Sequence, residues 1–464
     1  MRGLGRVKEN SPEEIESGNC LNSVKEALFS CPSQLLSLCA GGPRKEESCV
    51  VVKMKAKKRD LDDRLFWMPK EDEIKDAETT DVYFNYATEA LAYAKINPRV
   101  MMEVYTRNTP FDSNWAIACG IYEVAKLLEG LPIDVDAVEE GELFLTDPNL
   151  AIYEPVVQIE GRYQDFAKYE NPILGFLCQS SGICTKAARI ALAAEEKPVI
   201  SFGTRRAHPA LAPMIERSCV IGGLGSVSNV LGAKLLNKQP SGTMPHAFIL
   251  CVGNEEEAWK IFDRALAKSV PRIALVDTLS DEKIASIKAF ETLGKHLYGV
   301  RLDTPGSRKG DLKKIVQEVR WELNLRGASD VKIFASGGLD EQQVIELRDW
   351  VDGFGVGTSV SAASVIDFGG KIVEVQDSRT RNMILRSKRG DLSGRKYVYR
   401  DLRTMTDLIT NSPMPPGKKY RPLITPLIRN GEIVREFKTV DELKERTGRL
   451  VGAVSKTVPR MVWG

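Results

Sequence analysis

Strand-like and helix-like segments alternate from Lys197 onward, and this alternation constrains the fold more than any other feature of the 464-residue sequence. Short β-rich runs recur at spacings close to those of βα units, which need about 30 residues each. They are PVISFG, HAFILCVG, RIALVD, LYGVRLD, VKIFASGG and VDGFGVGTS. Such alternation predicts a parallel sheet with its chemistry at the carboxyl ends of the strands. We therefore expect an α/β protein with an irregular α/β barrel over residues 197–370.

One helix of this region shows its period clearly. From Asp311 the apolar residues fall on a single stripe, and Gly327 is a suitable residue to end the helix. The stripe consists of Leu312, Ile315, Val316, Val319 and Leu323.

Residues before the alternation predict an N-terminal α/β (α+β) domain. Helical spacing appears in 81–95 and 116–130, while 99–108 has the β-branched and aromatic content of a strand. Short strands are expected in 132–160, and a long helical stretch from about 164 to 196 leads into the barrel.

A chain longer than about 250–300 residues is expected to divide into domains. We expect a weakly ordered extension (1–53), the N-terminal domain with its connecting helix (54–196) and the barrel (197–370). A C-terminal segment (371–464) returns to the N-terminal domain. It carries a Pro-rich loop, and a capping box at 439–442 opens its final helix.

Composition excludes several classes of protein. The net charge of +2 gives no broad electrostatic case for nucleic acid or a membrane surface, and no run of about 18 apolar residues is present. The nine cysteines form no CxxC pair and no zinc-ligand spacing, so buried free thiols in a reducing cytoplasm fit best.

Two late βα junctions have the composition of phosphate cradles. Ser336, Gly337 and Gly338 follow one expected strand, and Gly357 and Thr358 follow the next. Glycines let backbone N–H groups approach a phosphate, and hydroxyls add donors. Tight-turn glycines are the alternative interpretation of each loop.

Charged residues stand at two earlier strand ends. Arg301 and Asp303 are two apart and share one side of a strand, so one can clamp an anion while the other accepts ribose hydroxyls or helps to hold Mg²⁺. Asp277 ends the preceding unit. Each aspartate could instead cap the following helix.

A different chemistry appears between residues 201 and 248. Phe202 offers an apolar face and Arg205 a fork for a carboxylate, which together suit an aromatic acid. The alternative is a core Phe beside a surface salt bridge. His246 opens the expected strand 246–252 and is a candidate nucleophile for a phosphoryl group. His208, before a proline, is expected to be scaffolding.

In this order the motifs resemble those of nicotinate phosphoribosyltransferases, especially the archaeal-type members of the type II phosphoribosyltransferase family. The likeness runs from about residue 80 to residue 400. Its elements are TDVYF, EGRY, GICTKAAR, SFGTRRAHP, GTMPHA, LVDT, RLDTPGSRKG, RWEL, SGGLDE, FGVGTS and LSGRK.

The resemblance implies transfer of a phosphoribosyl group from phosphoribosyl pyrophosphate to nicotinate, which gives nicotinate mononucleotide for NAD synthesis. It also implies Mg²⁺, ATP as a co-substrate hydrolysed through a phosphohistidine, and a homodimer with shared active sites. His246 would be the phosphohistidine and Asp303 a second catalytic residue. The nicotinate contacts would be Tyr83 from the partner subunit, Phe202, Arg205, Thr243 and Arg301. The phosphoribosyl contacts would be Asp277, Ser336, Gly337, Gly338, Gly357 and Thr358.

The sequence departs from the family in places. Gly225 stands where relatives often carry a polar or acidic residue, and no cysteine follows Cys251 where archaeal-type members often have a zinc module. Quinolinate and nicotinamide phosphoribosyltransferases are the alternative activities. A phosphate-binding barrel without catalysis is the alternative from another class.

Overall fold

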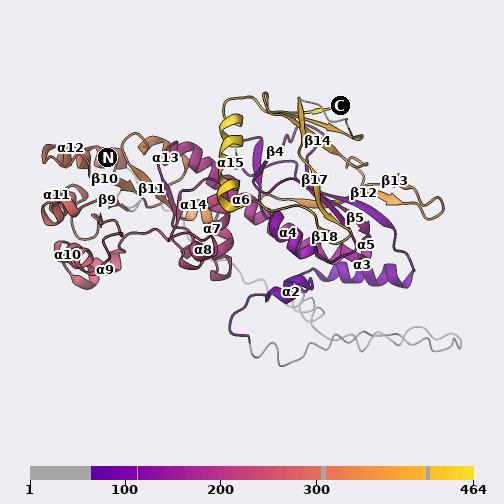
Figure 1. The fold of residues 1–464 in the computed structure, drawn as a ribbon, viewed down its shortest axis with the longest axis horizontal. Coiled ribbons are helices and arrows are strands. Elements are labelled where there is room, and N and C mark those ends of the chain that lie inside the picture. The colour runs from indigo at the N-terminus through magenta and orange to yellow at the C-terminus, as the bar shows by residue number, and fades with distance from the viewer. Residues whose placement is uncertain (1–63, 112, 305–309, 414–418) are drawn as a thin grey trace, which may run out of the picture. The chain divides into compact units, whose positions relative to one another are not determined.

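The computed structural model describes residues 64–111, 113–304, 310–413 and 419–464 (Figure 1). The chain divides into two compact units, Met1–Trp67 and Met68–Gly464, and the fold below is that of the second. The expected extension 1–53 lies outside the described residues.

A seven-stranded sheet combines strands from the two ends of this unit, in the order β13-β12-β1-β5-β3-β17-β18. The pairings of β1 with β12, of β1 with β5 and of β17 with β3 are antiparallel, so residues after 368 share a sheet with residues 99–162. The strands are β1 (Arg99–Tyr105), β3 (Asp134–Ala137), β5 (Pro155–Arg162), β12 (Gly369–Gln376), β13 (Met383–Leu385), β17 (Thr425–Arg429) and β18 (Glu432–Ile433).

The helix expected over 116–130 begins later than the sequence indicates. Residues Trp115–Ala118 form strand β2, which pairs with β4 (Glu142–Leu145), and only Ile121–Leu128 is helical, as α4. All four residues of β2 are buried, so pairing and burial override their neutral local propensity. Helix α3 (Val82–Tyr93) and strand β1 agree with the sequence.

The alternating region forms a six-stranded parallel sheet in the order β7-β6-β11-β10-β9-β8. In the described residues no ladder joins the outer strands β7 and β8, as suits an irregular barrel. The α/β fold is therefore confirmed. The strands are β6 (Val199–Ser201), β7 (Ser226–Val227), β8 (Ile273–Leu275), β9 (Gly299–Leu302), β10 (Lys332–Ala335) and β11 (Gly353–Val356).

The strand expected at residues 246–252 is wrong. This segment is helix α9 (His246–Val252), with Pro245 at its N-cap and Gly253 in the left-handed region at its C-cap, φ 80°. Only Ile249 of the seven residues is buried, whereas a central parallel strand is buried on both faces. The two-residue strand β7 lies beside β6 instead.

Helices surround both sheets and carry the expected signals. Helix α12 (Leu312–Leu325) has Asp311 as its N-cap and buries most of the predicted stripe, and α15 (Val440–Val454) begins with the predicted capping box. The remaining helices are α2 (Glu71–Lys75), α5 (Tyr163–Phe166), α7 (Ala212–Ile221), α8 (Val230–Leu235), α10 (Glu255–Ala265), α11 (Glu282–Leu293), α13 (Glu341–Leu347) and α14 (Thr358–Ser361), with short 3-10 turns η1 (Ala167–Tyr169), η2 (Thr204–Arg206), η3 (Pro209–Leu211) and η4 (Gly294–His296).

The long helix α6 (Glu170–Ala194) belongs to two hydrophobic cores. Ile173, Leu177 and Cys184 pack in the core of the seven-stranded sheet. Ile183 and Ile190 pack in the core of the parallel sheet.

A cluster of ion pairs around the buried Glu142 of β4 links it to the C-terminal part of the chain. Glu142 lies 3.1 Å from Arg400 and 3.0 Å from Arg421, and it also pairs with Arg446. These cations lower the pKa of Glu142 against the opposing effect of burial. Arg400 belongs to β14 (Tyr397–Asp401), within a further sheet of the order β16-β14-β15-β19 that includes β15 (Thr406–Thr410), β16 (Tyr420–Pro422) and β19 (Arg460–Trp463).

Candidate active site

The carboxyl ends of five parallel strands carry most of the predicted site residues. Phe202 follows β6, Asp277 follows β8 and Asp303 follows β9. The two glycine-bearing loops follow β10 and β11. Because parallel strands all point the same way, these residues meet at one edge of the sheet.

His246 reaches this edge from the first turn of α9. Its Nδ1 lies 3.0 Å from Oγ1 of Thr278, and its Nε2 lies 3.3 Å from Oδ2 of Asp303. A second carboxylate oxygen, Oδ1 of Asp277, is 4.0 Å from Nε2. The imidazole therefore stands between a hydroxyl and two carboxyl groups.

The two aspartates are fixed by their neighbours. The Asp303 backbone N–H donates to Oδ2 of Asp277 at 3.1 Å, and the Ser336 hydroxyl donates to Oδ1 of Asp303 at 2.8 Å. Ser336 is only 2% exposed, so it lies beneath Asp303. Oδ1 of Asp277 is buried without a hydrogen-bond partner among the described residues. Burial is the main cause that raises the pKa of Asp277, to about 6.

Phe202 and Arg301 form a platform of aromatic ring and guanidinium. The Arg301 Cζ lies 5.8 Å from the centre of the Phe202 ring. Burial lowers the pKa of Arg301, and its Nε is buried without a hydrogen-bond partner among the described residues. A buried donor without a partner is costly unless a ligand supplies an acceptor.

Two consecutive glycines of the loop after β10 adopt a left-handed backbone conformation, which other residues rarely take. Gly337 and Gly338 have φ values of 88° and 68°. A Cβ on Gly337 would lie 2.9 Å from the Asp303 carbonyl oxygen, whereas the Cβ direction of Gly338 is open. Thr358 begins α14 directly after Gly357, at the next strand end.

Three predicted residues form no hydrogen bond or ion pair with this group in the described residues, although the positive charge of Arg205 is near enough to contribute to the lowered pKa of Arg301. Within the described part of the chain, Arg205 and Thr243 form no hydrogen bond or ion pair with the other predicted site residues. Tyr83 lies on α3, is 54% exposed, and stacks at a tilt on Phe84 with 4.3 Å between ring centres. His208 accepts the Ala210 N–H at 3.2 Å, which agrees with scaffolding.

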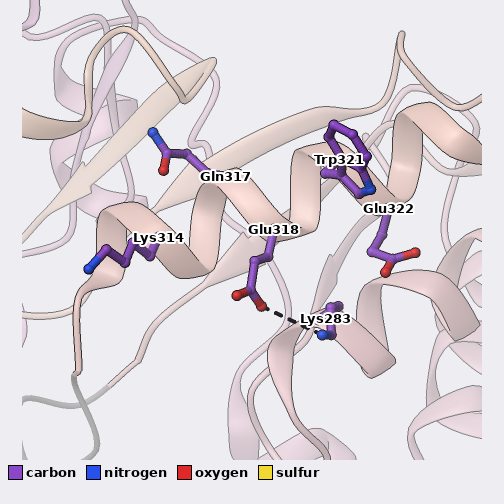
Figure 2. Close-up of a pocket in the computed structure, with 6 residues that line it drawn as sticks. All are labelled: Lys283, Lys314, Gln317, Glu318, Trp321 and Glu322. Atoms are coloured by element: carbon purple, nitrogen blue, oxygen red, sulfur yellow. Dashed lines mark ion pairs between the residues drawn. The ribbon is translucent and has the colours of Figure 1, made fainter.

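A cavity of about 330 Å³ lies away from these residues, between α11 and α12 (Figure 2). Figure 2 shows Glu318 of α12 pointing toward Lys283 of α11, with which it forms an ion pair at 3.6 Å. No predicted site residue lines this cavity. It therefore adds nothing to the strand-end chemistry.

A second cavity, of about 320 Å³, contains functional candidates that the sequence reasoning missed. Lys371, Arg386 and Lys388 line it together with Glu170 and Tyr163. In the described residues none of these three cations forms an ion pair, so they are available to an anionic ligand. The signal for Arg386 and Lys388 was the basic run at 386–396, which the sequence shows but does not assign, whereas Lys371 lies outside that run.

Tyr83 belongs to the surroundings of this second cavity. Its pKa is raised by burial first and then by the negative charge of Glu170. Burial also raises the pKa of Glu170 itself. Tyr83 and the three cations therefore stand near one carboxyl group.

Within the described residues no group of three or more His, Cys, Asp or Glu side chains is arranged to hold a metal. Nor does any described helix have the length and apolarity to cross a bilayer.

Two family models match the chain. Residues 81–181 match the model described as quinolinate phosphoribosyl transferase, N-terminal domain, and residues 183–371 match the corresponding C-terminal domain. Together they span more than half of the chain.

Known proteins agree with these matches. A nicotinate phosphoribosyltransferase of Mycobacterium tuberculosis is 28% identical over 397 residues, which are 77% of this chain and 82% of the relative. The crystal structure of a protein named nicotinate-nucleotide pyrophosphorylase, from Pyrococcus furiosus, has 46% identity and a TM-score of 0.80, covering 84% of this chain and 99% of its own. The human nicotinic acid phosphoribosyltransferase structure, at 19% identity and a TM-score of 0.65, covers 83% of this chain and 97% of its own, and supports the fold alone.

Proposed function

The chain belongs to the type II phosphoribosyltransferase family, and from this we infer that it is a nicotinate phosphoribosyltransferase of NAD biosynthesis. Its substrates are nicotinate and phosphoribosyl pyrophosphate, and its products are nicotinate mononucleotide and pyrophosphate. The observation that carries the assignment to a pyridine acid is the Phe202–Arg301 platform, placed at the same strand ends as Asp303 and the loop after β10.

The chemistry of phosphoribosyl transfer matches what this edge offers. The pyridine nitrogen attacks the anomeric carbon of the ribose as the bond to pyrophosphate breaks, and positive charge develops on the sugar. Positioning and charge stabilisation supply most of the catalysis in such a reaction. The Phe202 face holds the ring, Arg301 meets its carboxylate, and Asp303 faces the sugar.

ATP hydrolysis is coupled to this transfer through His246 in our proposal. The support is the position of its imidazole, 3.3 Å from Asp303, which in turn accepts a hydrogen bond from Ser336 of the loop after β10. A phosphoryl group on His246 adds up to about two negative charges near the site.

We place the active site between two copies of the chain, with Tyr83 of one copy against Phe202 of the other. Exposed apolar side chains on α3, including Val82 and Tyr86, and on α8, including Val230 and Leu235, provide surfaces for such an interface. Glu170 lines the second cavity and lies near Tyr83, so the cavity's cations Lys371, Arg386 and Lys388 would face the diphosphate in the active site of the neighbouring copy.

Mg²⁺ enters this scheme bound to the diphosphate. Magnesium commonly keeps several waters and takes one or two carboxylates plus substrate phosphates as ligands. The strand-end aspartates fit that pattern, since they supply oxygen ligands without forming a closed cage. We also place the enzyme in the cytoplasm, because its five described cysteines are free thiols.

Quinolinate is the second candidate substrate, because the matching family models are named for it. A diacid requires cations for two carboxylates. On the described platform only Arg301 is largely buried, with a side chain 11% exposed, whereas Arg205 is exposed and forms no hydrogen bond or ion pair with the platform among the described residues. This favours the monoacid.

A matrix of substrates tests the proposal. Purified enzyme with Mg²⁺ and phosphoribosyl pyrophosphate is given nicotinate, nicotinamide or quinolinate, each with and without ATP, and the nucleotide product is measured. We expect nicotinate mononucleotide from nicotinate and stimulation by ATP. Product from quinolinate alone would replace nicotinate with the diacid, and no product from any acid would refute the activity.

The variant His246→Ala tests the coupling separately. It should form no phosphoenzyme with γ-labelled ATP and lose the stimulation by ATP. Stimulation that survives this substitution would refute the role of His246 while leaving the substrate assignment intact.

A further inference from the structure

The surroundings of His246 assign its two ring nitrogens different roles. A neutral imidazole carries one N–H donor and one lone-pair acceptor. Nε2 faces the carboxylates of Asp303, at 3.3 Å, and Asp277, at 4.0 Å. Ionised carboxylates only accept hydrogen bonds, so the ring proton resides on Nε2. Nδ1 is left with the lone pair.

Thr278 is the group that meets this lone pair. Its Oγ1 is 3.0 Å from Nδ1, so the Thr278 hydroxyl is the donor and Nδ1 the acceptor. The backbone that follows Thr278 is fixed by a buried carboxylate. Glu255, which is 5% exposed, accepts the N–H groups of the next two residues, Leu279 at 2.9 Å and Ser280 at 3.3 Å. A β-branched side chain is also stiff at χ1.

We propose that Thr278 is a positioning residue that caps Nδ1 of His246 in the resting enzyme and transfers its hydrogen bond to the phosphoryl group once that group is bound. This rests on the proposed phosphohistidine. In the step itself the Nδ1 lone pair forms the bond to the γ-phosphorus of ATP, and the P–O bond to ADP breaks with its electrons leaving on ADP.

In this step the carboxylate of Asp303 and the hydroxyl of Thr278 have different roles. Nδ1 has no proton to lose, and the positive charge that the ring gains is balanced through Nε2–H by Asp303. The Thr278 O–H, released from Nδ1, then donates to a phosphoryl oxygen. Without that donor the phosphoenzyme should hydrolyse faster.

Nitrogen NMR of the histidine rings tests the cap without any turnover. The chain has only three histidines, so ¹⁵N-histidine labelling gives three ring systems. His296 is an internal control, because its Nδ1 lies 3.0 Å from the acceptor Oδ2 of Asp263 and is therefore expected to carry a proton. We expect His246 as the Nε2–H tautomer, with a hydrogen-bonded Nδ1. A proton on Nδ1 of His246 would overturn the proposal.

Two substitutions at Thr278 then isolate the hydroxyl. Thr278→Val, which keeps the shape, should move the Nδ1 resonance to that of a nitrogen without a hydrogen bond, and Thr278→Ser should restore it. The phosphoenzyme of Thr278→Val should decay about tenfold faster, the size expected for losing one hydrogen bond to a charged group. Unchanged Nδ1 resonance and unchanged decay in Thr278→Val would refute the role.

A matched control removes a hydroxyl nearby without touching the imidazole. Thr304 is fully buried and donates to Glu282 at 2.9 Å. Thr304→Val should leave the His246 resonances in place, which separates the cap from a general disturbance. Should the wild-type enzyme form no phosphoenzyme, the coupling proposed above fails, while the resonances still decide whether Thr278 caps Nδ1.

Discussion

A single added methyl group behind Phe202 tests whether that ring is the substrate platform. In Gly355→Ala the new Cβ would lie 2.5 Å from Cδ2 of Phe202, and nearer still to Cε2. Ordinary contacts begin at 3.4 Å, so restoring one at Cδ2 needs a shift of about 0.9 Å, and the nearer Cε2 must move by more than that. Overpacking of this kind costs about 1–3 kcal/mol of stability.

The expected effect on catalysis is larger than the effect on stability. A displacement of about 1 Å in a positioning group can lower turnover by about 100-fold. We therefore expect kcat/KM for nicotinate to fall by between tenfold and 100-fold in Gly355→Ala. The assay is initial-rate formation of nicotinate mononucleotide at saturating phosphoribosyl pyrophosphate, with thermal unfolding measured in parallel.

The same strand supplies a matched control. In Gly353→Ala the new Cβ would lie 2.9 Å from Cε1 of Phe334, a ring outside the platform. This variant should lose similar stability but keep its kcat/KM for nicotinate. If both variants lose stability and neither loses activity, the reasoning that places nicotinate on Phe202 is refuted.

Three further predictions concern the carboxyl groups and their partners. Ser336→Ala removes the hydrogen-bond donor to Asp303 and should lower kcat about tenfold in steady-state assays. The KM for phosphoribosyl pyrophosphate should change little. A rise in that KM alone would mean that Ser336 contacts phosphate. Glu142→Gln removes the buried carboxylate charge that three arginines share. Arg400 keeps Asp407 and Arg446 keeps Glu139, but Arg421 is left without an ion pair among the described residues, so the change should cost about 3 kcal/mol in urea unfolding. Glu445→Gln in an exposed pair should cost almost nothing, and equal costs would contradict this. Asp277 has a folded pKa raised to about 6, above the unfolded value, so its stabilising contribution is present below about pH 4 and lost as pH rises through 6. Relative to wild type, Asp277→Asn should therefore gain on the order of 2 kcal/mol in unfolding free energy between pH 4 and pH 7, and a constant difference would show that Asp277 does not titrate in this range.

The parts of the fold that the sequence predicted are those whose signal is local. Each βα unit carries its own apolar strand, its own turn and its own amphipathic helix, and α12 shows all three features. Strand β2 and helix α9 were assigned wrongly because both segments are apolar and short. Pairing with β4 decides the first, and the caps Pro245 and Gly253 decide the second.

The candidate site divides in the same way. Asp277 and Asp303 follow neighbouring strands, so topology alone is enough to bring them together, whereas His246 reaches them from helix α9, where a strand was expected. The hydroxyl of Thr278 and the cations Arg386 and Lys388 could not be assigned from the sequence. The role of Thr278 depends on its contact with a side chain distant in the sequence, and that of the two cations depends on the absence of an ion-pair partner. Spacing along the chain encodes neither.

The shared helix α6 has a consequence for how the protein unfolds. Because Leu177 and Cys184 face one core while Ile183 and Ile190 face the other, neither sheet can lose this helix without exposing apolar surface. The two layers are thus thermodynamically linked through one rod of about 37 Å. We therefore expect loosening of the parallel-sheet half to weaken the packing of the half that bears Tyr83, and the unit from Met68 onward to unfold cooperatively.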